Sequence, residues 1–135
     1  MSWVCDPDLY KLIVRANHTF KIERMTLVSD GGGGHTETPT IILAVWPGYC
    51  EELNEVTTEA LGRRGIIATH LVMGPVSDSA GLALEIRRDD VLTGLSPDEL
   101  KDRRFCIEKA EVHPYRVATE TEGRHYELTV REIKA

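Results

Sequence analysis

The sequence predicts an α+β fold, in one compact domain over residues 1–135. We expect a mixed or mostly antiparallel sheet of about five or six strands with two or three helices. Three observations predict this class. The length of 135 residues suits one hydrophobic core. Hydrophobic residues make up 41% of the chain, too many for a disordered protein. Strand-like alternation and helix-like periodicity both occur along the chain.

The first two elements are a short helix and a strand. Asp6 or Asp8, together with Pro7, favours a helix start, and the helix extends to about Ala16 with Leu9, Leu12 and Ile13 on one face. A strand follows over residues 19–29. Its apolar residues change phase near Arg24, which predicts a β-bulge there.

Residues 30–39 contain four consecutive glycines and no apolar side chain, so we expect a flexible glycine-rich loop. A strand–helix–strand unit over residues 40–73 comes next. The apolar run at 40–46 predicts a strand buried on both faces. Helical spacing over 49–62 predicts a helix, and residues 66–73 read as a second strand. If the two strands are parallel, their crossover is right-handed.

The last third of the chain predicts a C-terminal β-hairpin. Before it, residues 74–81 read as a loop, residues 82–86 as a strand with a helix as the alternative, and residues 96–104 as a short helix opened by Ser96-Pro97. The hairpin turns at Glu122-Gly123 and places these residues on one apolar face: Tyr115, Val117, Tyr126, Leu128 and Val130.

Charge and cysteine content exclude several function classes. The net charge of −6 argues against nucleic-acid binding that depends on clustered Lys and Arg. Three cysteines without a CxxC pair favour a reducing compartment. The chain has no recognisable secretory signal and no apolar run that could span a membrane. We therefore expect a cytoplasmic protein without a membrane partner.

Cys50 is the candidate nucleophile. The expected helix over 49–62 would place it in a first turn, where backbone N–H groups and the helix dipole favour a thiolate. If the flanking strands are parallel, His70 or His35 could act as the base and Asp78 as the group that orients it. Glu51 and the apolar pattern around Cys50 favour a buried structural cysteine instead.

The same sheet edge is the candidate ligand site. Its expected ligand-binding residues are Trp46, Gly48, Tyr49, Ser77 and His35. The glycine loop lacks the lysine of a phosphate-binding loop, and the histidines lack metal-ligand spacing, so we expect no cofactor and no metal.

The sequence favours a small non-enzymatic module that works through contact with a protein partner or through self-association as a homo-oligomer. Bacterial and bacteriophage accessory proteins commonly have this profile. One alternative is a small Cys/His hydrolase or transferase with its site at the carboxyl edge of residues 40–46 and 66–73. Another is a protein that sequesters a small ligand or nucleotide at that edge.

Overall fold

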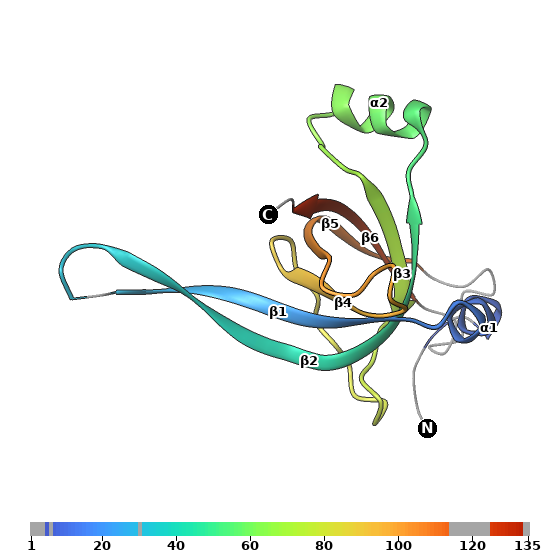
Figure 1. The fold of residues 1–135 in the computed structure, drawn as a ribbon, viewed down its shortest axis with the longest axis horizontal. Coiled ribbons are helices and arrows are strands. Elements are labelled where there is room, and N and C mark those ends of the chain that lie inside the picture. The colour runs from blue at the N-terminus through green and yellow to red at the C-terminus, as the bar shows by residue number, and fades with distance from the viewer. Residues whose placement is uncertain (1–4, 6, 30, 114–124, 134–135) are drawn as a thin grey trace.

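Six antiparallel strands close into a barrel in the order β1-β2-β3-β6-β5-β4 (Figure 1). The computed structural model describes residues 5, 7–29, 31–113 and 125–133. Within these residues the coarse expectation is confirmed: the structure has a six-stranded antiparallel sheet with two helices. The elements in chain order are α1 (Pro7–Ala16), β1 (His18–Ser29), β2 (His35–Glu52), α2 (Glu55–Arg63), β3 (His70–Pro75), β4 (Val91–Ser96), β5 (Arg104–His113) and β6 (His125–Ile133).

Aromatic side chains fill the barrel. Trp46, Phe20 and Phe105 are fully buried and pack with inward-facing aliphatic residues of all six strands. Trp46 fits only because its neighbours are small: a Cβ at Gly74 would overlap the indole ring, and one at Gly48 would lie 3.1 Å from it. The interior is therefore packed with side chains.

The β1–β2 hairpin extends well beyond the barrel (Figure 1). β4 pairs with β1 only at Thr19–Glu23, so later residues of β1 pair with β2 alone. We call residues 24–29 and 35–40 the arm. Residues 35–39 were expected in a flexible loop, but they form strand with the register Ser29↔His35, which leaves the glycine segment as the turn. The bulge predicted near Arg24 occurs earlier, between Phe20 and Glu23.

The strand–helix–strand order predicted over 40–73 is present as β2, α2 and β3, but three details of the prediction are wrong. β2 and β3 are antiparallel, so no parallel crossover exists between them. The strand at 40–46 is not buried on both faces, since the side chains of Ile41 and Val45 are 58% and 53% exposed. β2 also continues through Glu52, because every second residue from Trp46 to Cys50 points into the barrel.

α2 stands clear of the barrel, on the connection between β2 and β3 (Figure 1). It is shorter than the predicted helix over 49–62 and begins after Asn54. The Asn54 side chain accepts a hydrogen bond from the Thr57 N–H at 2.8 Å. None of its nine residues is buried. The other helix, α1, packs Leu9 and Ile13 with Tyr49 and Met73.

Two further predictions are wrong. Residues 82–86 form neither strand nor helix, but a loop with an isolated bridge between Ser77 and Ala83. Residues 97–102 form turns instead of a helix, with the Leu100 N–H donating to the Pro97 carbonyl at 2.9 Å. The turns are tight because the chain folds back over Gly94, where a Cβ would overlap the Leu100 carbonyl.

The C-terminal hairpin exists, but its first strand is β5. Tyr126, Leu128 and Val130 share the buried face, as predicted. Their partners are Val112, Ala110 and Ile107, seven or more residues earlier than the expected partners. The predicted turn at Glu122-Gly123 and the predicted strand residues 115–119 lie outside the described residues. Neither helix in the described part of the chain is long and apolar enough to cross a membrane.

Candidate functional site

Cys50 lies inside the barrel on β2, opposite Val72 of β3. The helix start expected for it does not exist there, so no helix dipole favours its thiolate. Burial raises the pKa of the thiol to about 11, outweighing the opposite influence of Arg103, while Glu132 and Glu51 raise it further. The thiol is thus protonated at neutral pH, as in a structural cysteine.

His70 shares the inward face with Cys50. It is the first residue of β3, two positions before Val72, and therefore a diagonal neighbour of Cys50 across the strand pair. The ring packs edge-on against Phe105 with centroids 5.1 Å apart. Its Nδ1 lies 2.8 Å from the Thr69 hydroxyl. These contacts hold the imidazole within the packed barrel wall.

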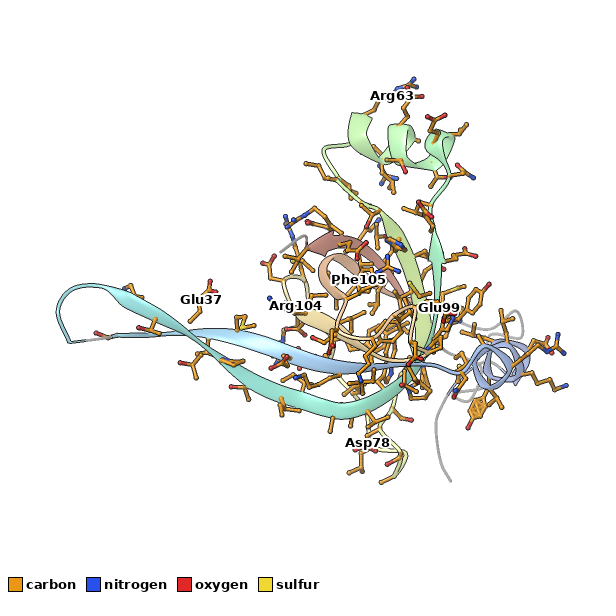
Figure 2. All side chains as sticks on the ribbon, in the orientation of Figure 1. Glu37, Arg63, Asp78, Glu99, Arg104 and Phe105 are labelled. Carbon is orange, nitrogen blue, oxygen red and sulfur yellow. The ribbon has the colours of Figure 1, made fainter. Side chains whose placement is uncertain are left out.

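Asp78 belongs to a different end of β3. It follows the last strand residue, Pro75, whereas His70 begins the strand, and such a strand spans roughly 17 Å. Figure 2 shows Asp78 well away from Phe105, the residue against which His70 packs. The Asp78 carboxylate accepts the N–H groups of Ala80 and Leu82, each at 2.9 Å. Asp78 therefore organises a loop, and the structure does not bring it to Cys50 and His70.

The five predicted ligand-binding residues lie in separate places. Trp46 and Gly48 belong to the packed interior, where the indole N–H donates to the Pro75 carbonyl at 3.1 Å. Ser77 is buried in the loop after β3 and donates to the Asp78 carbonyl. Tyr49 stacks on His18 near α1. His35 is exposed on the arm. The predicted site required two parallel strands that end at the same edge of the sheet. Because β2 and β3 are antiparallel, no such shared edge exists and the five residues do not meet.

His18 joins β1 to β2 through its side chain. Its backbone pairs with Gly48, and the next pair along the ladder would need residue 16, which lies in α1. The His18 ring replaces that missing acceptor: its Nδ1 accepts the Cys50 N–H at 3.0 Å. Burial lowers the pKa of His18, and Glu99 opposes that effect. Only the neutral imidazole with its proton on Nε2 can accept this bond.

The polar side chains of the barrel wall form ion pairs. Arg103 donates two hydrogen bonds to the Glu132 carboxylate, at 2.7 and 2.8 Å, and its guanidinium covers the Phe105 ring. Arg24 likewise donates two hydrogen bonds to the carboxylate of buried Asp90, at 2.9 and 3.0 Å. Within the described ranges, no group of three or more His, Cys, Asp or Glu residues could hold a metal ion.

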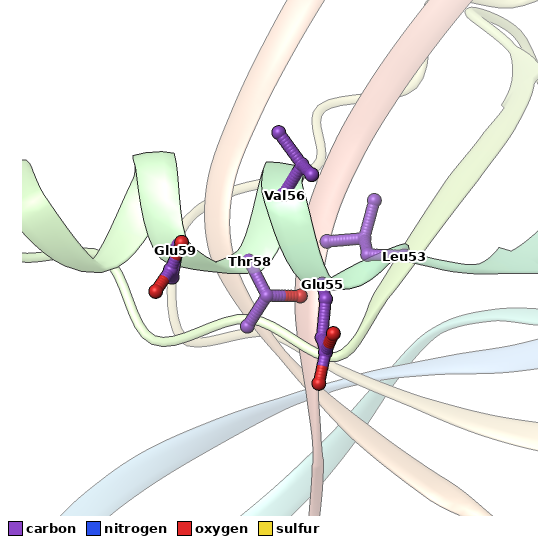
Figure 3. Close-up of a pocket in the computed structure, with 5 residues that line it drawn as sticks. All are labelled: Leu53, Glu55, Val56, Thr58 and Glu59. Atoms are coloured by element: carbon purple, nitrogen blue, oxygen red, sulfur yellow. The ribbon is translucent and has the colours of Figure 1, made fainter.

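A hollow of about 450 Å³ lies beside α2 (Figure 3). It is lined by Leu53, Glu55, Val56, Thr58 and Glu59, all from α2 and the residues before it. The lining offers two carboxylates but no histidine or cysteine. Val56, which lines the hollow, is the most exposed large apolar side chain of α2, with 77% of its surface exposed. This hollow is therefore part of the protruding helix and is separate from Cys50 and His70.

The exposed hairpin and helix are features that the sequence analysis does not predict. The arm and α2 leave the barrel in different directions (Figure 1). Ile41 and Val45 are exposed near the base of the arm, and Val56 and Ile67 on and beside α2. Two signals were present in the sequence: Asn54 directly before Glu55 is an N-cap pattern, and the threonines at 36, 38 and 40 alternate as in a strand with a wet face.

The candidate site is thus the pair of protruding elements, whose geometry suits contact with another surface. The barrel interior supplies the scaffold that carries them. No family model matches this chain, and no curated protein and no solved structure is significantly similar to it.

Proposed function

We propose that the protein is a small binding and assembly module, which acts through contact with a protein partner or with further copies of itself. The observation that carries the proposal is α2. It is a nine-residue helix with no buried residue, whereas isolated helices shorter than about 12–15 residues are marginal in water. Packing of one face against another surface is what normally stabilises so short a helix.

Local features prepare α2 for docking. Asn54 caps its first turn, and Gly65, with φ of 80°, lets the chain reverse after its last turn. The Ile66 N–H then donates to the Leu61 carbonyl at 2.9 Å. These bonds set the ends of the helix without any contact from the barrel. Val56 and Ile67, 77% and 70% exposed, are the apolar groups that a partner would cover.

The arm supports the same function. A two-stranded hairpin alone is marginally stable in water, and among the described residues no third strand pairs with either outer edge of this one. Protruding hairpins and helices of this kind enlarge the surface that a small protein offers to an assembly. The packed barrel and the protonated Cys50 thiol give less support to the hydrolase and ligand-sequestering alternatives.

A photo-crosslinking experiment tests the role of α2. A benzophenone amino acid replaces Val56 in one full-length chain and Asp98, exposed on the β4–β5 turn, in a matched control. We expect irradiation of native extract, and of the purified chain, to give a defined adduct from position 56 and none from position 98. Mass spectrometry identifies the adduct as a second copy or another protein.

A second experiment places a charge on the exposed face of α2. Val56→Asp should abolish competition with the crosslinking chain, while Thr58→Asp on the same helix should compete normally. Circular dichroism of both variants checks that they are folded. The proposal is overturned if position 56 gives no adduct in either setting, or only the background pattern that position 98 also gives.

A further inference from the structure

The two outer edges of the arm differ. On β2, the outer edge of the arm contains Pro39 and the charged residue Glu37. Prolines and charges are the usual means by which proteins block an exposed strand edge. On β1, the segment Met25–Ser29 has no proline and no charged residue. One edge of the arm is thus protected against strand addition and the other is not.

The register defines which backbone groups lie on the open edge. Met25 pairs with Pro39, which has no N–H. Proline fits at a pair whose N–H positions point away from the partner strand. Since such pairs alternate, the N–H groups of Met25, Leu27 and Ser29 point outward from β1. Those of Thr26 and Val28 point toward β2. The open edge thus presents an alternating row of free backbone donors and acceptors.

We propose that this edge of β1 pairs, antiparallel and about a two-fold axis at Leu27, with the same edge of a second copy. The inference rests on the proposed function, because it names one contact through which the module self-associates. In this register Met25 lies opposite Ser29 of the other copy and Thr26 opposite Val28. The product is a four-stranded sheet in the order β2-β1-β1-β2, which adds backbone hydrogen bonds to a hairpin that is marginal by itself.

The absence of charged residues over 25–29 suits a second copy of the same segment as the occupant. Two chains of net charge −6 repel each other, so they can meet only where like charges are kept apart. The shared segment is uncharged, and Arg24 at its base is neutralised by Asp90. Glu37 lies on the outer strand of each arm in the four-stranded sheet, away from its counterpart. The barrels lie at opposite ends, because each arm projects away from its own barrel (Figure 1).

The extent of the pairing is limited by the fold. In this register Gly31 of one copy reaches the position of Glu23 in the other, where β4 begins to pair with β1. The pairing cannot extend further, because β4 already occupies the edge of β1 from Glu23 to Thr19. The turn glycines have no side chains that would collide with β4. A shared edge of this length is far smaller than a standard interface of about 800 Å² per partner. Association should therefore depend on concentration and be favoured where an assembly holds neighbouring arms together.

Amide hydrogen exchange of the full chain tests the pairing residue by residue. At low concentration, the Met25, Leu27 and Ser29 amides should exchange freely, while Thr26 and Val28 are protected by β2. At high concentration the three outward amides should become protected in parallel with a rise in mass by sedimentation velocity. The outward amides of His35 and Glu37 on β2 should remain unprotected. The pairing is refuted if the outward β1 amides stay unprotected or if the mass remains that of a monomer.

Two sets of variants identify the partner strand. Leu27→Pro removes an outward N–H of β1, and Glu37→Pro removes the outward N–H of its cross-strand partner. Only Leu27→Pro should abolish the rise in mass; an equal loss in both variants would contradict the assignment to β1.

A charge exchange keeps the test valid if proline disturbs the arm. The variant Met25→Lys/Ser29→Lys should stay monomeric, since lysines would face each other across the axis. Mixing it with Met25→Glu/Ser29→Glu should restore dimers. Absence of restoration would refute pairing between copies. Because α2 crosslinking is measured separately, its failure and the failure of this pairing are distinguishable.

Discussion

The barrel and its protruding elements are stabilised in different ways. Trp46, Phe20 and Phe105 bring together residues from strands far apart in sequence, and their burial closes the barrel. α2 depends on bonds between residues only a few positions apart, beginning with Asn54 and Thr57. The difference teaches that long-range burial holds the barrel, whereas α2 depends on local bonds and the arm on the pairing of β1 with β2.

The largest effect should follow from emptying the barrel. Trp46→Ala removes a fully buried indole and its hydrogen bond to Pro75, and we expect a loss of about 3–5 kcal/mol in the free energy of unfolding. Val56→Ala on exposed α2 should change it by less than about 0.5 kcal/mol. Urea titrations of the two variants measure this contrast. Equal losses would show that α2 belongs to the cooperative core.

The reactivity of Cys50 tests whether the barrel is only a scaffold. With a pKa of about 11 against an ordinary 9.0, its thiolate fraction near neutrality is roughly 100-fold below that of an unperturbed thiol. We expect alkylation by iodoacetamide to be slower than that of N-acetylcysteine by at least this factor. Peptide mapping assigns the modified cysteine. Faster alkylation at Cys50 than at the small thiol would revive the hydrolase alternative.

Asp90 links the arm to the barrel. Its buried carboxylate accepts two hydrogen bonds from Arg24 and one from the Arg87 N–H at 2.8 Å. Asp90→Ala leaves the half-buried Arg24 without this partner, and we expect a loss of about 2–3 kcal/mol by urea titration. Glu85→Ala, in an exposed ion pair of the same loop, should give no measurable loss. If both variants lose stability equally, the junction is not held by Asp90.

Asn54 separates local from global stability. Asn54→Ala removes the cap of α2, which should cost the helix about 1 kcal/mol. Because no residue of α2 is buried, the melting temperature of the whole protein should stay unchanged. Amide exchange over 55–63 should accelerate, while exchange in β3 should not. A lowered melting temperature would mean that the helix and barrel unfold together.

The smallest effect should come from the acid titration of His18. Its folded-state pKa is lowered, chiefly by burial, so the neutral ring is the form that the fold prefers. This contribution to stability is fully present above about pH 6.5 and is lost as the pH falls through the folded-state pKa. The Cys50 amide should exchange faster over the same range, because protonation removes its acceptor. His18→Gln should abolish that pH dependence, and His35→Gln on the arm should not.

Apolar periodicity predicted helices and strands best where one face of the element is buried and the other is exposed. Leu9 and Ile13 marked α1 because they face the barrel end together. Tyr126, Leu128 and Val130 marked β6 because they alternate into the core. The predicted helix over 49–62 includes both Cys50 and Val56. The end of β2 and the start of α2 together have apolar residues at spacings that resemble one continuous helix. The Asn54 cap was the local signal that divides them.

The predicted catalytic site is wrong because the direction of the strands differs from the one it required. The prediction places Cys50, His70 and Asp78 together only if two strands run parallel and end at one edge of the sheet. Antiparallel pairing of β2 with β3 brings Cys50 and His70 to one inner face by register, and leaves Asp78 beyond the far end of β3. Strand direction depends on contacts between distant residues, which a local pattern does not contain.

The sequence alone determined features that depend on neighbouring residues: the start of α1, the alternation of apolar residues along β6, and the absence of charge over 25–29. The tertiary structure decided that the strands close into a barrel, that Trp46 occupies the space left by Gly74, and that the arm and α2 are exposed. The physical reason is that closure and exposure depend on long-range burial, and no single segment determines what will cover it.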